Sequence, residues 1–402
     1  MVDKKVPELR FEGFDGDWEQ RKLGESVKFI NGRAYKQNEL LDCGKYRVLR
    51  VGNFNTNDRW YYSDLELDCN KYANTGDLLY LWATSFGPEI WSEEKVIYHY
   101  HIWKLLIEEN SINKQYLYTW LLTDKERIKQ STNGTTMVHI TKGNMEIREF
   151  QFPKKITEQK LIGMFFKKID DTTALHQQKL DQLKRLKQGF LQILFGNKEQ
   201  APKVRFAGFD EEWEQRKLGE VVECFEYGLN AAAREYDGKN KYLRITDIDE
   251  ETHLFKSEKL TSPDINLSNA DNYKLKENDV LFARTGASVG KTYRYRLEDG
   301  LIYYAGFLIR ARIKSEFSTE FIFQNTLTSK YNQYIKIASQ RSGQPGVNAQ
   351  EYSKFELFVP NLEEQQKIGS FFKQLDDAIA LHQTKLEKLK QLKQAFLQKM
   401  FI

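Results

Sequence analysis

The same eight residues, WEQRKLGE, occur twice in this chain, at Trp18–Glu25 and again at Trp213–Glu220. They belong to a longer match, in which PELRFEGFDGDWEQRKLGE from Pro7 corresponds to PKVRFAGFDEEWEQRKLGE from Pro202, at an offset of 195 residues (213 − 18). Two copies of so long a unit are too few for a solenoid, which needs three or more short repeats. The repeat therefore predicts a duplicated chain with internal two-fold pseudosymmetry.

A second pair of matching segments closes each half. TEQKLIGMFFKKIDDTTALHQQKLDQLKRLKQGFLQILF at Thr157–Phe195 matches EEQQKIGSFFKQLDDAIALHQTKLEKLKQLKQAFLQKMF at Glu363–Phe401, at an offset of 206 residues (382 − 176). The second half is thus 11 residues longer than the first (206 − 195), and the extra residues must lie in the poorly matching stretch. The plan is a variable block, a repeated segment, another variable block and the repeated segment again.

Both closing segments predict a long helix with a narrow apolar stripe. A seven-residue spacing indicates a helix that pairs with another helix, and about 38 residues at 1.5 Å each span roughly 57 Å. Because the stripe occurs twice, we expect the two helices to pair with each other, antiparallel, as a spacer between the variable blocks. The residues expected in the seam are Ile162, Ile169, His176, Leu183, Phe190, Ile368, Leu375, His382, Leu389 and Phe396. The neighbouring rows hold Phe166, Thr173, Leu180 and Leu194, with Leu186 close to the seam, and Phe372, Ile379, Leu386 and Leu392.

The midpoints of the two closing segments are both histidines, His176 and His382. An antiparallel pairing about a two-fold axis places these two rings together. Neighbouring imidazoles disfavour double protonation, so we expect the helix pair to weaken at acid pH. A slid register would remove this contact, and rings more than about 10 Å apart would rule it out, because screening makes such charges nearly independent.

The variable blocks, roughly residues 20–155 and 215–361, predict mixed α/β domains. Short aromatic and β-branched runs between Gly, Asn and Asp indicate strands: YLWATSF, KVIYHYHIW, KYLRITDI, DVLFART, KTYRYRL and LIYYAGFLIRARI. Helices are expected at INKQYLYTWLLTDKERIKQ and at STEFIFQNTLTSKYNQYIKIAS. The layouts correspond while the sequences differ: NGRAYKQ with YGLNAAARE, KYRVLRVGNFN with KYLRITDID, GDLLYLWATSFG with NDVLFARTGASVG, and STNGTTMVHIT with RSGQPGVNAQ. Two modules of one fold with different surfaces predict a chain that binds two related but unequal targets.

Composition narrows the class of protein. A hydrophobic content of 40% is enough for a packed interior, while 61 basic and 57 acidic residues leave a net charge of only +4, so any basic surface must come from local clustering. No run approaches the roughly 18 apolar residues of a membrane span. The start, MVDKKVPELRFEGF, has no apolar segment typical of a secretory signal. Cys43, Cys69 and Cys224 fit neither a disulfide framework nor a zinc site, and we expect lone buried thiols in a reducing cytosol.

The loops between the predicted elements are rich in Arg, Lys, Asn, Gln, Ser and Thr, with Trp and Tyr nearby. Such groups reach phosphates and base edges, with Arg suited to guanine and Asn or Gln suited to adenine. An ordinary solvated loop explains any single case better. The recurrence of these loops at equivalent places in both halves favours nucleic-acid binding.

The opening motif RFxGFDxxWEQRKLGE and the closing motif EQxxIGxFFxxxDD…LHQxKLxxLKxLKQxFLQ together resemble the DNA-specificity subunit of type I restriction–modification enzymes. The resemblance covers nearly the whole chain and implies that each variable block is a target recognition domain. It also implies that the paired helices set the gap between two half-sites. The implied partners are double-stranded DNA, two adenine methyltransferase (modification) subunits and, in the full complex, two motor-nuclease (restriction) subunits.

We therefore predict an α+β protein, in which two mixed α/β target recognition domains are joined by two long antiparallel helices forming a coiled coil. The expected boundaries are residues 1–156 and 199–362 for the recognition domains, and 157–198 and 363–402 for the spacer helices. Two domains on a stiff rod read a split, non-palindromic site whose half-site centres lie about one helical turn, roughly 34 Å, apart. A change of one helical turn in the rod, ~5.4 Å, is expected to change the gap by about one or two base pairs.

The candidate DNA-binding residues lie in the loops. In the first domain they are Arg33, Lys36, Arg50, Asn53, Trp82, Thr84, Ser85, Asn133, Thr135, Thr136 and His139. In the second domain they are Asn230, Arg234, Arg244, Arg284, Thr285, Ser288, Lys291, Arg341, Ser342, Gln344 and Asn348.

Catalytic, cofactor and metal sites are not expected. RTGASVGKT at Arg284–Thr292 has only three residues between its glycines and precedes a predicted strand, so it indicates a hairpin near DNA rather than a phosphate loop. No N-P-P-[FYW] or D-P-P-Y motif of an adenine methyltransferase occurs. His99 and His101 are expected on one face of a strand without metal-ligating neighbours. The pairs Asp170–Asp171 and Asp376–Asp377 are interpreted as solvated charges or as contacts to a modification subunit.

One alternative stays open: a scaffold of two adaptor domains on a coiled coil that binds only proteins. That alternative predicts no preference among DNA duplexes.

Overall fold

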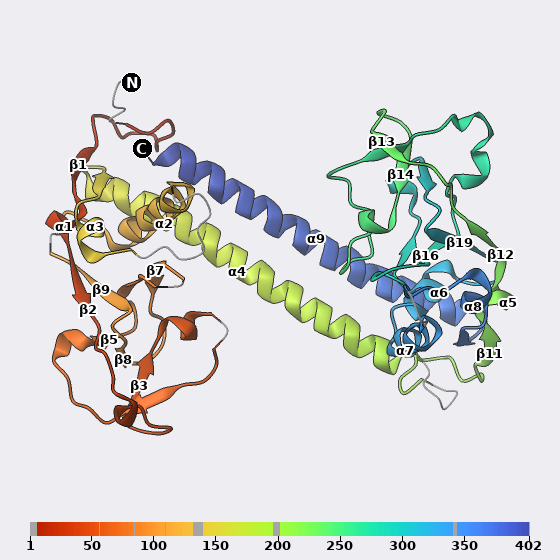
Figure 1. Ribbon diagram of the computed structural model, residues 1–402, viewed down its shortest axis with the longest axis horizontal. Coiled ribbons are helices and arrows are strands. Elements are labelled where there is room, and N and C mark those ends of the chain that lie inside the picture. Colours follow the sequence, from red (N-terminus) through yellow and green to blue (C-terminus); the bar gives the residue numbers. More distant parts are fainter. Residues whose placement is uncertain are drawn as a thin grey trace. The chain divides into compact units, whose positions relative to one another are not determined.

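The computed structural model describes residues 6–55, 57–83, 85–108, 110–131, 140–195, 202–340 and 344–401. The chain divides into two compact units (Figure 1). Unit 1 comprises Met1–Leu175 and Leu386–Ile402, and unit 2 comprises His176–Lys385. Each long helix therefore contributes residues to both units.

Unit 1 holds an antiparallel four-stranded sheet of order β2-β9-β6-β7 and a mixed sheet of order β4-β3-β8-β5, in which β3 and β8 run parallel. A separate pair, β1-β10, lies beside the start of the first long helix. The strands are β1 (Glu19–Lys22), β2 (Val27–Asn31), β3 (Tyr46–Leu49), β4 (Tyr61–Ser63), β5 (Tyr72–Ala73), β6 (Leu78–Leu81), β7 (Gly87–Ile90), β8 (Val96–Tyr98), β9 (Ile102–Ile107) and β10 (Glu149–Phe152). The helices are α1 (Leu23–Ser26), α2 (Lys114–Ser131), α3 (Lys142–Glu146) and α4 (Ile156–Ile193), with 3-10 turns η1 (Gln37–Glu39), η2 (Val51–Phe54) and η3 (Cys69–Lys71).

Unit 2 repeats the antiparallel sheet, in the order β12-β19-β16-β17, and the terminal pair β11-β20. In place of the mixed four-stranded sheet it has the parallel pair β14-β18 and the separate antiparallel pair β13-β15. Its strands are β11 (Glu214–Lys217), β12 (Val222–Tyr227), β13 (Ala233–Glu235), β14 (Lys241–Leu243), β15 (Thr261–Pro263), β16 (Asp279–Ala283), β17 (Thr292–Arg294), β18 (Ile302–Tyr304), β19 (Leu308–Ile313) and β20 (Glu356–Val359). Its helices are α5 (Leu218–Val221), α6 (Thr319–Asn325), α7 (Ser329–Ala338), α8 (Ala349–Ser353) and α9 (Leu362–Met400), with 3-10 turns η4 (Ile245–Asp247), η5 (Leu267–Asn269), η6 (Asp271–Tyr273) and η7 (Leu297–Asp299). The two variable blocks therefore share one α+β plan although their sequences differ.

The WEQRKLGE repeat closes each domain against its long helix. Its EQRK residues form β1 in the first half and β11 in the second. β1 pairs with β10, the last strand before α4, and β11 pairs with β20, the last strand before α9. Its tryptophans, Trp18 and Trp213, are buried, and its leucine amides, at Leu23 and Leu218, each donate a 2.8 Å hydrogen bond to the chain before that last strand. The string occurs twice because each half must make the same closure.

Buried charge anchors the first turn of each long helix. Arg10 donates to Glu158 at 2.6 and 2.8 Å, and Arg205 donates to Glu364 at 3.0 and 2.7 Å. Both glutamate side chains are fully buried. These charge-assisted bonds tie the segment before WEQRKLGE to the helix.

The helix contacts within each unit run antiparallel, because early residues of α4 meet late residues of α9. In unit 1 the rings of Phe165 and Phe396 lie 4.9 Å apart, and in unit 2 those of Phe190 and Phe371 lie 4.8 Å apart. The two pairs exchange under the repeat offset, since 190 + 206 = 396 and 165 + 206 = 371. This antiparallel pairing of the two long helices is the one that the repeated heptad pattern predicted.

Two of the four repeated aspartates do not face solvent or an outside subunit as expected. Lys393 Nζ lies 2.5 Å from Asp170 within unit 1, and Lys187 Nζ lies 2.6 Å from Asp376 within unit 2. Asp171 and Asp377 pair with lysines of their own helices, Lys167 and Lys373, and remain exposed. Consecutive residues of a helix point about 100° apart, so Asp170 and Asp376 face the other helix while Asp171 and Asp377 do not.

His176 and His382 meet as the midpoint argument predicted. Their Nδ1 atoms lie 2.9 Å apart and their ring centroids 5.0 Å apart, both within unit 2. At this distance one ring donates a hydrogen bond and the other accepts it, so at least one imidazole nitrogen of the contact is unprotonated.

The predicted seam residues line the helix contact to different depths. Ile162, Ile169, Leu183 and Ile368 are buried, and the other six are partly buried. Leu186, expected close to the seam, and Leu392, expected on a neighbouring row, are 47% and 45% exposed, so both face away from the facing helix. Each precedes the inward-facing lysine of its helix by one residue, which turns it about 100° away from the partner.

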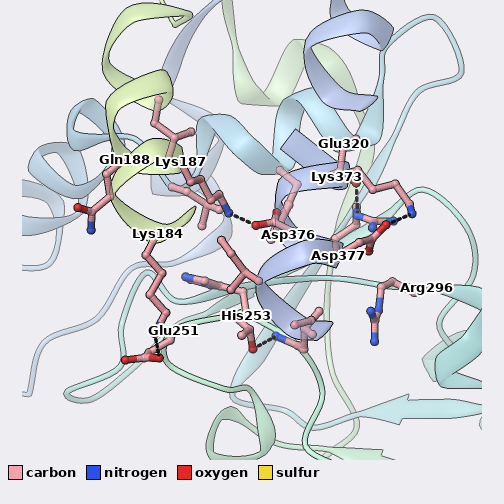
Figure 2. Close-up of a pocket in the computed structure, with 18 of the residues that line it drawn as sticks. Lys184, Lys187, Gln188, Glu251, His253, Arg296, Glu320, Lys373, Asp376 and Asp377 are labelled. Carbon is pink, nitrogen blue, oxygen red and sulfur yellow. Dashed lines mark hydrogen bonds and ion pairs between the residues drawn. The ribbon is translucent and has the colours of Figure 1, made fainter. Parts of the chain in front are cut away.

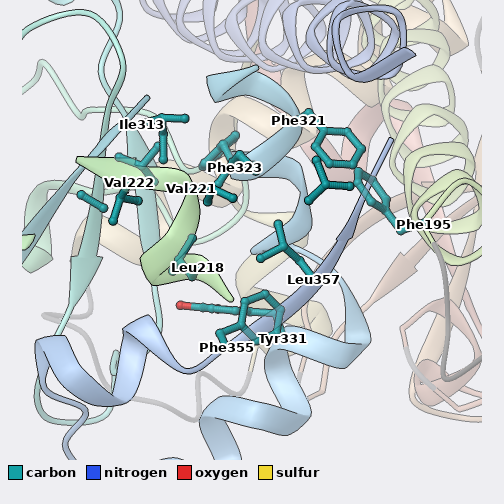
Figure 3. Close-up of a cluster of buried hydrophobic side chains, with 14 of the residues drawn as sticks. Phe195, Leu218, Val221, Val222, Ile313, Phe321, Phe323, Tyr331, Phe355 and Leu357 are labelled. Carbon is teal, nitrogen blue, oxygen red and sulfur yellow. The ribbon is translucent and has the colours of Figure 1, made fainter. Parts of the chain in front are cut away.

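Each unit has its own core. Figure 3 shows part of the unit 2 core, which includes Val221 of α5, Ile313 of β19, Phe321 of α6 and Phe195, just after the end of α4. The single helix expected over 318–339 is instead two, α6 and α7. The break is capped, because Thr328 Oγ1 accepts a hydrogen bond from the amide of Tyr331.

The cysteines differ from the expectation of lone buried thiols. Cys43 and Cys69 are exposed rather than buried, because they lie in the surface segments before β3 and in η3, and Cys224 is half-buried on β12. No helix in the described part of the chain combines the length and apolar character that crossing a bilayer requires.

Candidate nucleic-acid interface

A tight turn between β8 and β9, residues 99–101, gathers predicted residues of unit 1. The amide of Tyr100 donates to the carbonyl of Arg33 at 3.0 Å, and the amide of Trp82 donates to the carbonyl of His101 at 3.2 Å. The amide of His99 donates to Leu49 O at 2.9 Å, which places the following residue, Arg50, at the same turn. Backbone hydrogen bonds thus bring together residues from three separate loops.

Aromatic side chains dominate this first turn. Trp82 Nε1 donates to Tyr100 O at 2.8 Å, and the Trp82 ring lies 4.9 Å from His101 and stacks on Trp103 at 5.9 Å. Tyr100 itself is exposed. Burial, reinforced by neighbouring His101 and Arg50, lowers the pKa of His99 to about 4, so His99 is neutral at physiological pH.

The basic residues of unit 1 differ in how much charge they present. Arg33 is bound bidentately by Glu39, at 2.8 and 3.0 Å, and the amide of Lys36 donates to the same carboxylate. Arg50 pairs with no carboxylate in the described part of the chain, and its guanidinium lies 4.3 Å from the centre of the Tyr61 ring. Arg50 is therefore the stronger candidate for a phosphate or base contact.

Asn53 and Ser85 make local hydrogen bonds. Asn53 Oδ1 accepts from the amide of Arg50 at 3.0 Å, and its Nδ2 donates to the carbonyls of Asn57 and Arg59. Ser85 Oγ accepts from Asn55 Nδ2 at 3.2 Å. Both side chains shape the loops beside the turn.

The equivalent turn of unit 2 lies between β18 and β19, at residues 305–307. The amide of Arg284 donates to Phe307 O at 3.0 Å, and its guanidinium lies 3.5 Å from Gly306 O and 4.9 Å from the centre of the Tyr227 ring. The amide of Gly306 donates to Leu229 O, which brings the exposed Asn230 to the turn.

Other predicted residues of unit 2 join this turn through neighbouring strands. The amide of Ala305 donates to Leu243 O at 2.9 Å, and Arg244 follows that residue. Thr285 forms a β-bridge with Gly346, which brings the exposed Gln344 close to the same hairpin. The second turn therefore gathers five predicted residues: Asn230, Arg244, Arg284, Thr285 and Gln344.

Three further predicted residues have other partners. Lys291 is only 9% exposed, and its ammonium is paired with Glu250, so its charge is neutralised inside unit 2. Asn348 caps α8, accepting from the amide of Glu351 at 2.9 Å, and Arg234 on β13 lies 3.6 Å from Asp237. Ser288 lines a shallow hollow beside Lys291. The remaining predicted residues, Thr84, Asn133, Thr135, Thr136, His139, Arg341 and Ser342, lie outside the described residues.

The segment RTGASVGKT forms the hairpin between β16 and β17, as its sequence predicted, with Phe282 opposite Thr292. Gly286 and Gly290 adopt φ of +77° and +87°, which favours glycine. A side chain at Gly290 would also lie 2.6 Å from Ile335.

His99 and His101 do not lie on one strand face as expected, because the chain turns between β8 and β9 at these residues. Within the described ranges, no group of three or more His, Cys, Asp or Glu side chains could hold a metal ion.

A cavity of about 320 Å³ lies within unit 2, between the long helices and the loop at 250–254 (Figure 2). Its walls carry charges of both signs that are already paired: Lys187 with Asp376, and Lys373 with Asp377. The carboxylate of Glu251 lies 2.5 Å from Lys184 and accepts from Gln383 at 3.2 Å, so this loop ties the second domain to both helices.

Sequence reasoning missed the aromatic residues of the turns. Tyr100, Phe307 and Tyr227 are all exposed and lie beside predicted residues. The available signal was position, since HYH and AGF lie in the middle of the corresponding runs KVIYHYHIW and LIYYAGFLIRARI.

The fold and this site define a class: a two-domain protein that carries the same turn twice with different side chains. The chain belongs to the family described as the type I restriction modification DNA specificity domain, which it matches over residues 15–185 and 210–391. It is 22% identical to the type I restriction enzyme MjaVIII specificity subunit of Methanocaldococcus jannaschii, over 94% of this chain and 90% of that one. It is also 22% identical to the Escherichia coli type I restriction enzyme EcoBI specificity subunit, over 89% of this chain and 79% of that one.

The fold has a solved counterpart. The crystal structure of a type I restriction–modification system S subunit from M. genitalium superposes with a TM-score of 0.72 at 16% identity, covering 99% of each chain. This similarity supports the fold.

Proposed function

We propose that this chain is the specificity subunit of a type I restriction–modification system, which reads a bipartite, asymmetric DNA site. The observation that carries the proposal is the pair of equivalent turns. Each is held by the same backbone hydrogen bonds, yet one carries Trp82 where the other carries Arg284. One scaffold with two sets of base-contacting side chains suits two different half-sites.

The DNA contacts are assigned to the two turns. In the first domain the contacting residues are Arg33, Lys36, Arg50 and Trp82, and in the second they are Asn230, Arg244, Arg284, Thr285 and Gln344. The net charge of +4 is small. The isolated chain therefore binds DNA weakly, and partner subunits add phosphate contacts.

The partners are two methyltransferase subunits and, in the complete enzyme, two motor-nuclease subunits. Support comes from the duplication of the chain, since a surface present once in each half suits two copies of one partner. The catalytic steps belong to those partners, and the complex acts on DNA in the cytoplasm. The two long helices set the gap between the half-sites, so removing one helical turn from both, ~5.4 Å, shortens the gap by about one or two base pairs.

Methylome sequencing with and without this gene tests the proposal. Loss of one bipartite adenine-methylation motif on deletion, and its return on complementation, is the expected result. An unchanged methylome, together with a purified complex that binds all duplexes alike, would favour the protein-binding scaffold instead.

A further inference from the structure

We propose that Phe307 reads a thymine methyl group in the second half-site, next to the base contacted by Arg284. The inference rests on the proposed function and adds a specificity residue to it. Phe307 is 63% exposed at the tip of the turn between β18 and β19.

The position of Phe307 is fixed relative to Arg284. The amide of Arg284 donates to Phe307 O at 3.0 Å, so the two residues are backbone neighbours on adjacent segments. The guanidinium of Arg284 is in turn held over the ring of Tyr227 at 4.9 Å. A side chain held in this way meets DNA with little loss of conformational entropy.

The surroundings of Phe307 suit DNA. The predicted polar and basic residues Arg284, Asn230 and Gln344 lie around the same turn, which is joined to them through backbone contacts. Asp247, a carboxylate in η4 near the turn, is bound bidentately by Arg244 at 2.8 and 2.9 Å, which neutralises its repulsion of phosphate.

The chemistry of phenylalanine selects the base feature. A phenyl ring neither donates nor accepts a conventional hydrogen bond, so the edge that it rewards in the major groove is the apolar thymine methyl group. Most of the Phe307 side chain is exposed, so the ring can enter a groove about 12 Å wide. Unit 1 has the polar His101 at the equivalent position, because the amide of Trp82 donates to its carbonyl. The two half-sites therefore differ at this base pair.

The test uses the assembled methyltransferase complex with full-length chain and the motif found by methylome sequencing. Each thymine of the second half-site is replaced in turn by uracil, which lacks only the methyl group. Wild-type binding is expected to fall about fourfold at one position, the value for one buried methyl group. Phe307→Ala should bind the thymine and uracil duplexes equally, while Phe307→Leu keeps part of the difference.

Leu297→Ala is the matched control, since Leu297 is 66% exposed in η7 of the same unit. It should leave the thymine preference intact, and melting curves of all variants show whether they fold. Wild-type binding that ignores every uracil replacement overturns the inference, as does a thymine preference that survives in Phe307→Ala. A uniform loss on all duplexes in Phe307→Ala also overturns it, because it indicates a wedge between base pairs. None of these results removes the bipartite motif, whereas failure of the proposed function does.

Discussion

The turn at 99–101 and the turn at 305–307 occupy the same place in two copies of one domain, but their side chains differ in kind. The first presents Trp82, which stacks on Trp103, and the second presents Arg284, which lies over Tyr227. Equivalent backbone hydrogen bonds hold both turns. Side chains at these turns can therefore change without loss of the fold, which suits a protein whose halves read different sequences.

A second contrast concerns charge. Asn53 and Asp247 accept equivalent hydrogen bonds from the amides of Arg50 and Arg244, each at 3.0 Å. Asp247 also binds the guanidinium of Arg244, whereas the neutral Asn53 leaves that of Arg50 over an aromatic ring. The residue at this equivalent position, Asn or Asp, therefore decides whether the neighbouring guanidinium is paired with a carboxylate or is left to contact DNA.

The largest expected effects should be equal in the two halves. Glu158→Ala and Glu364→Ala each remove a fully buried carboxylate and strand an arginine, at a cost of about 2–3 kcal/mol of folding free energy. Denaturant titration of the two variants measures both losses. A difference of more than about 1.4 kcal/mol, a factor of ten in stability, would break the equivalence of the two anchors.

The turns should behave oppositely. Arg284→Ala is expected to weaken binding by about 1–3 kcal/mol and to relax the second half-site only, because a bidentate base contact is lost. Trp82→Ala should affect the first half-site only. Competition binding with duplexes altered in one half-site separates the two outcomes, and Arg284→Lys tests whether fork geometry or charge matters. An unchanged second half-site in Arg284→Ala would contradict the assignment of this turn.

The charge contrast is tested by salt dependence. Arg50→Ala should reduce the slope of log K against log salt by about 1, the value for one phosphate contact. Arg244→Ala should change the slope less, because Asp247 already neutralises that guanidinium. Asp247→Asn, which copies the residue of the first domain, should raise the slope. Equal slopes for all three variants would show that neither arginine meets a phosphate.

The smallest effect concerns acid pH. Burial, the adjacent His176 ring and the charges of Lys385 and Lys179 lower the pKa of His382. A folded-state pKa below the unfolded value near 6.5 means that stability is full above pH 6.5 and falls as pH drops from there toward the folded-state pKa. The melting temperature should fall less between pH 7.5 and pH 5 in His176→Gln/His382→Gln than in wild type. An identical decline in both proteins would remove the pair as the cause.

Much of the fold follows from local patterns. Heptad spacing predicts both long helices, and the duplication predicts that they meet antiparallel with His176 beside His382. The hairpin at 284–292 follows from glycine spacing. Such features depend on periodicity and on pairs of like segments, which a single sequence displays.

The site was less predictable. Arg284 and Arg244 were identified from residue type, but the pairing of Lys291 with Glu250 and of Arg244 with Asp247 was not. The exposed aromatic at Phe307 was also missed. In a strand-and-loop domain, the side chains that face one another depend on strand register and on single 3-10 turns, and neither leaves a periodic signal.

The amino-acid sequence alone therefore determined the duplication, the two long helices and the family of this protein, because repeated segments and heptads are visible without coordinates. Tertiary structure decided which arginines are paired with a carboxylate and which loops meet at one turn. The physical reason is that charge neutralisation acts over a few ångströms in space, between residues whose separation along the chain has no fixed relation to that distance.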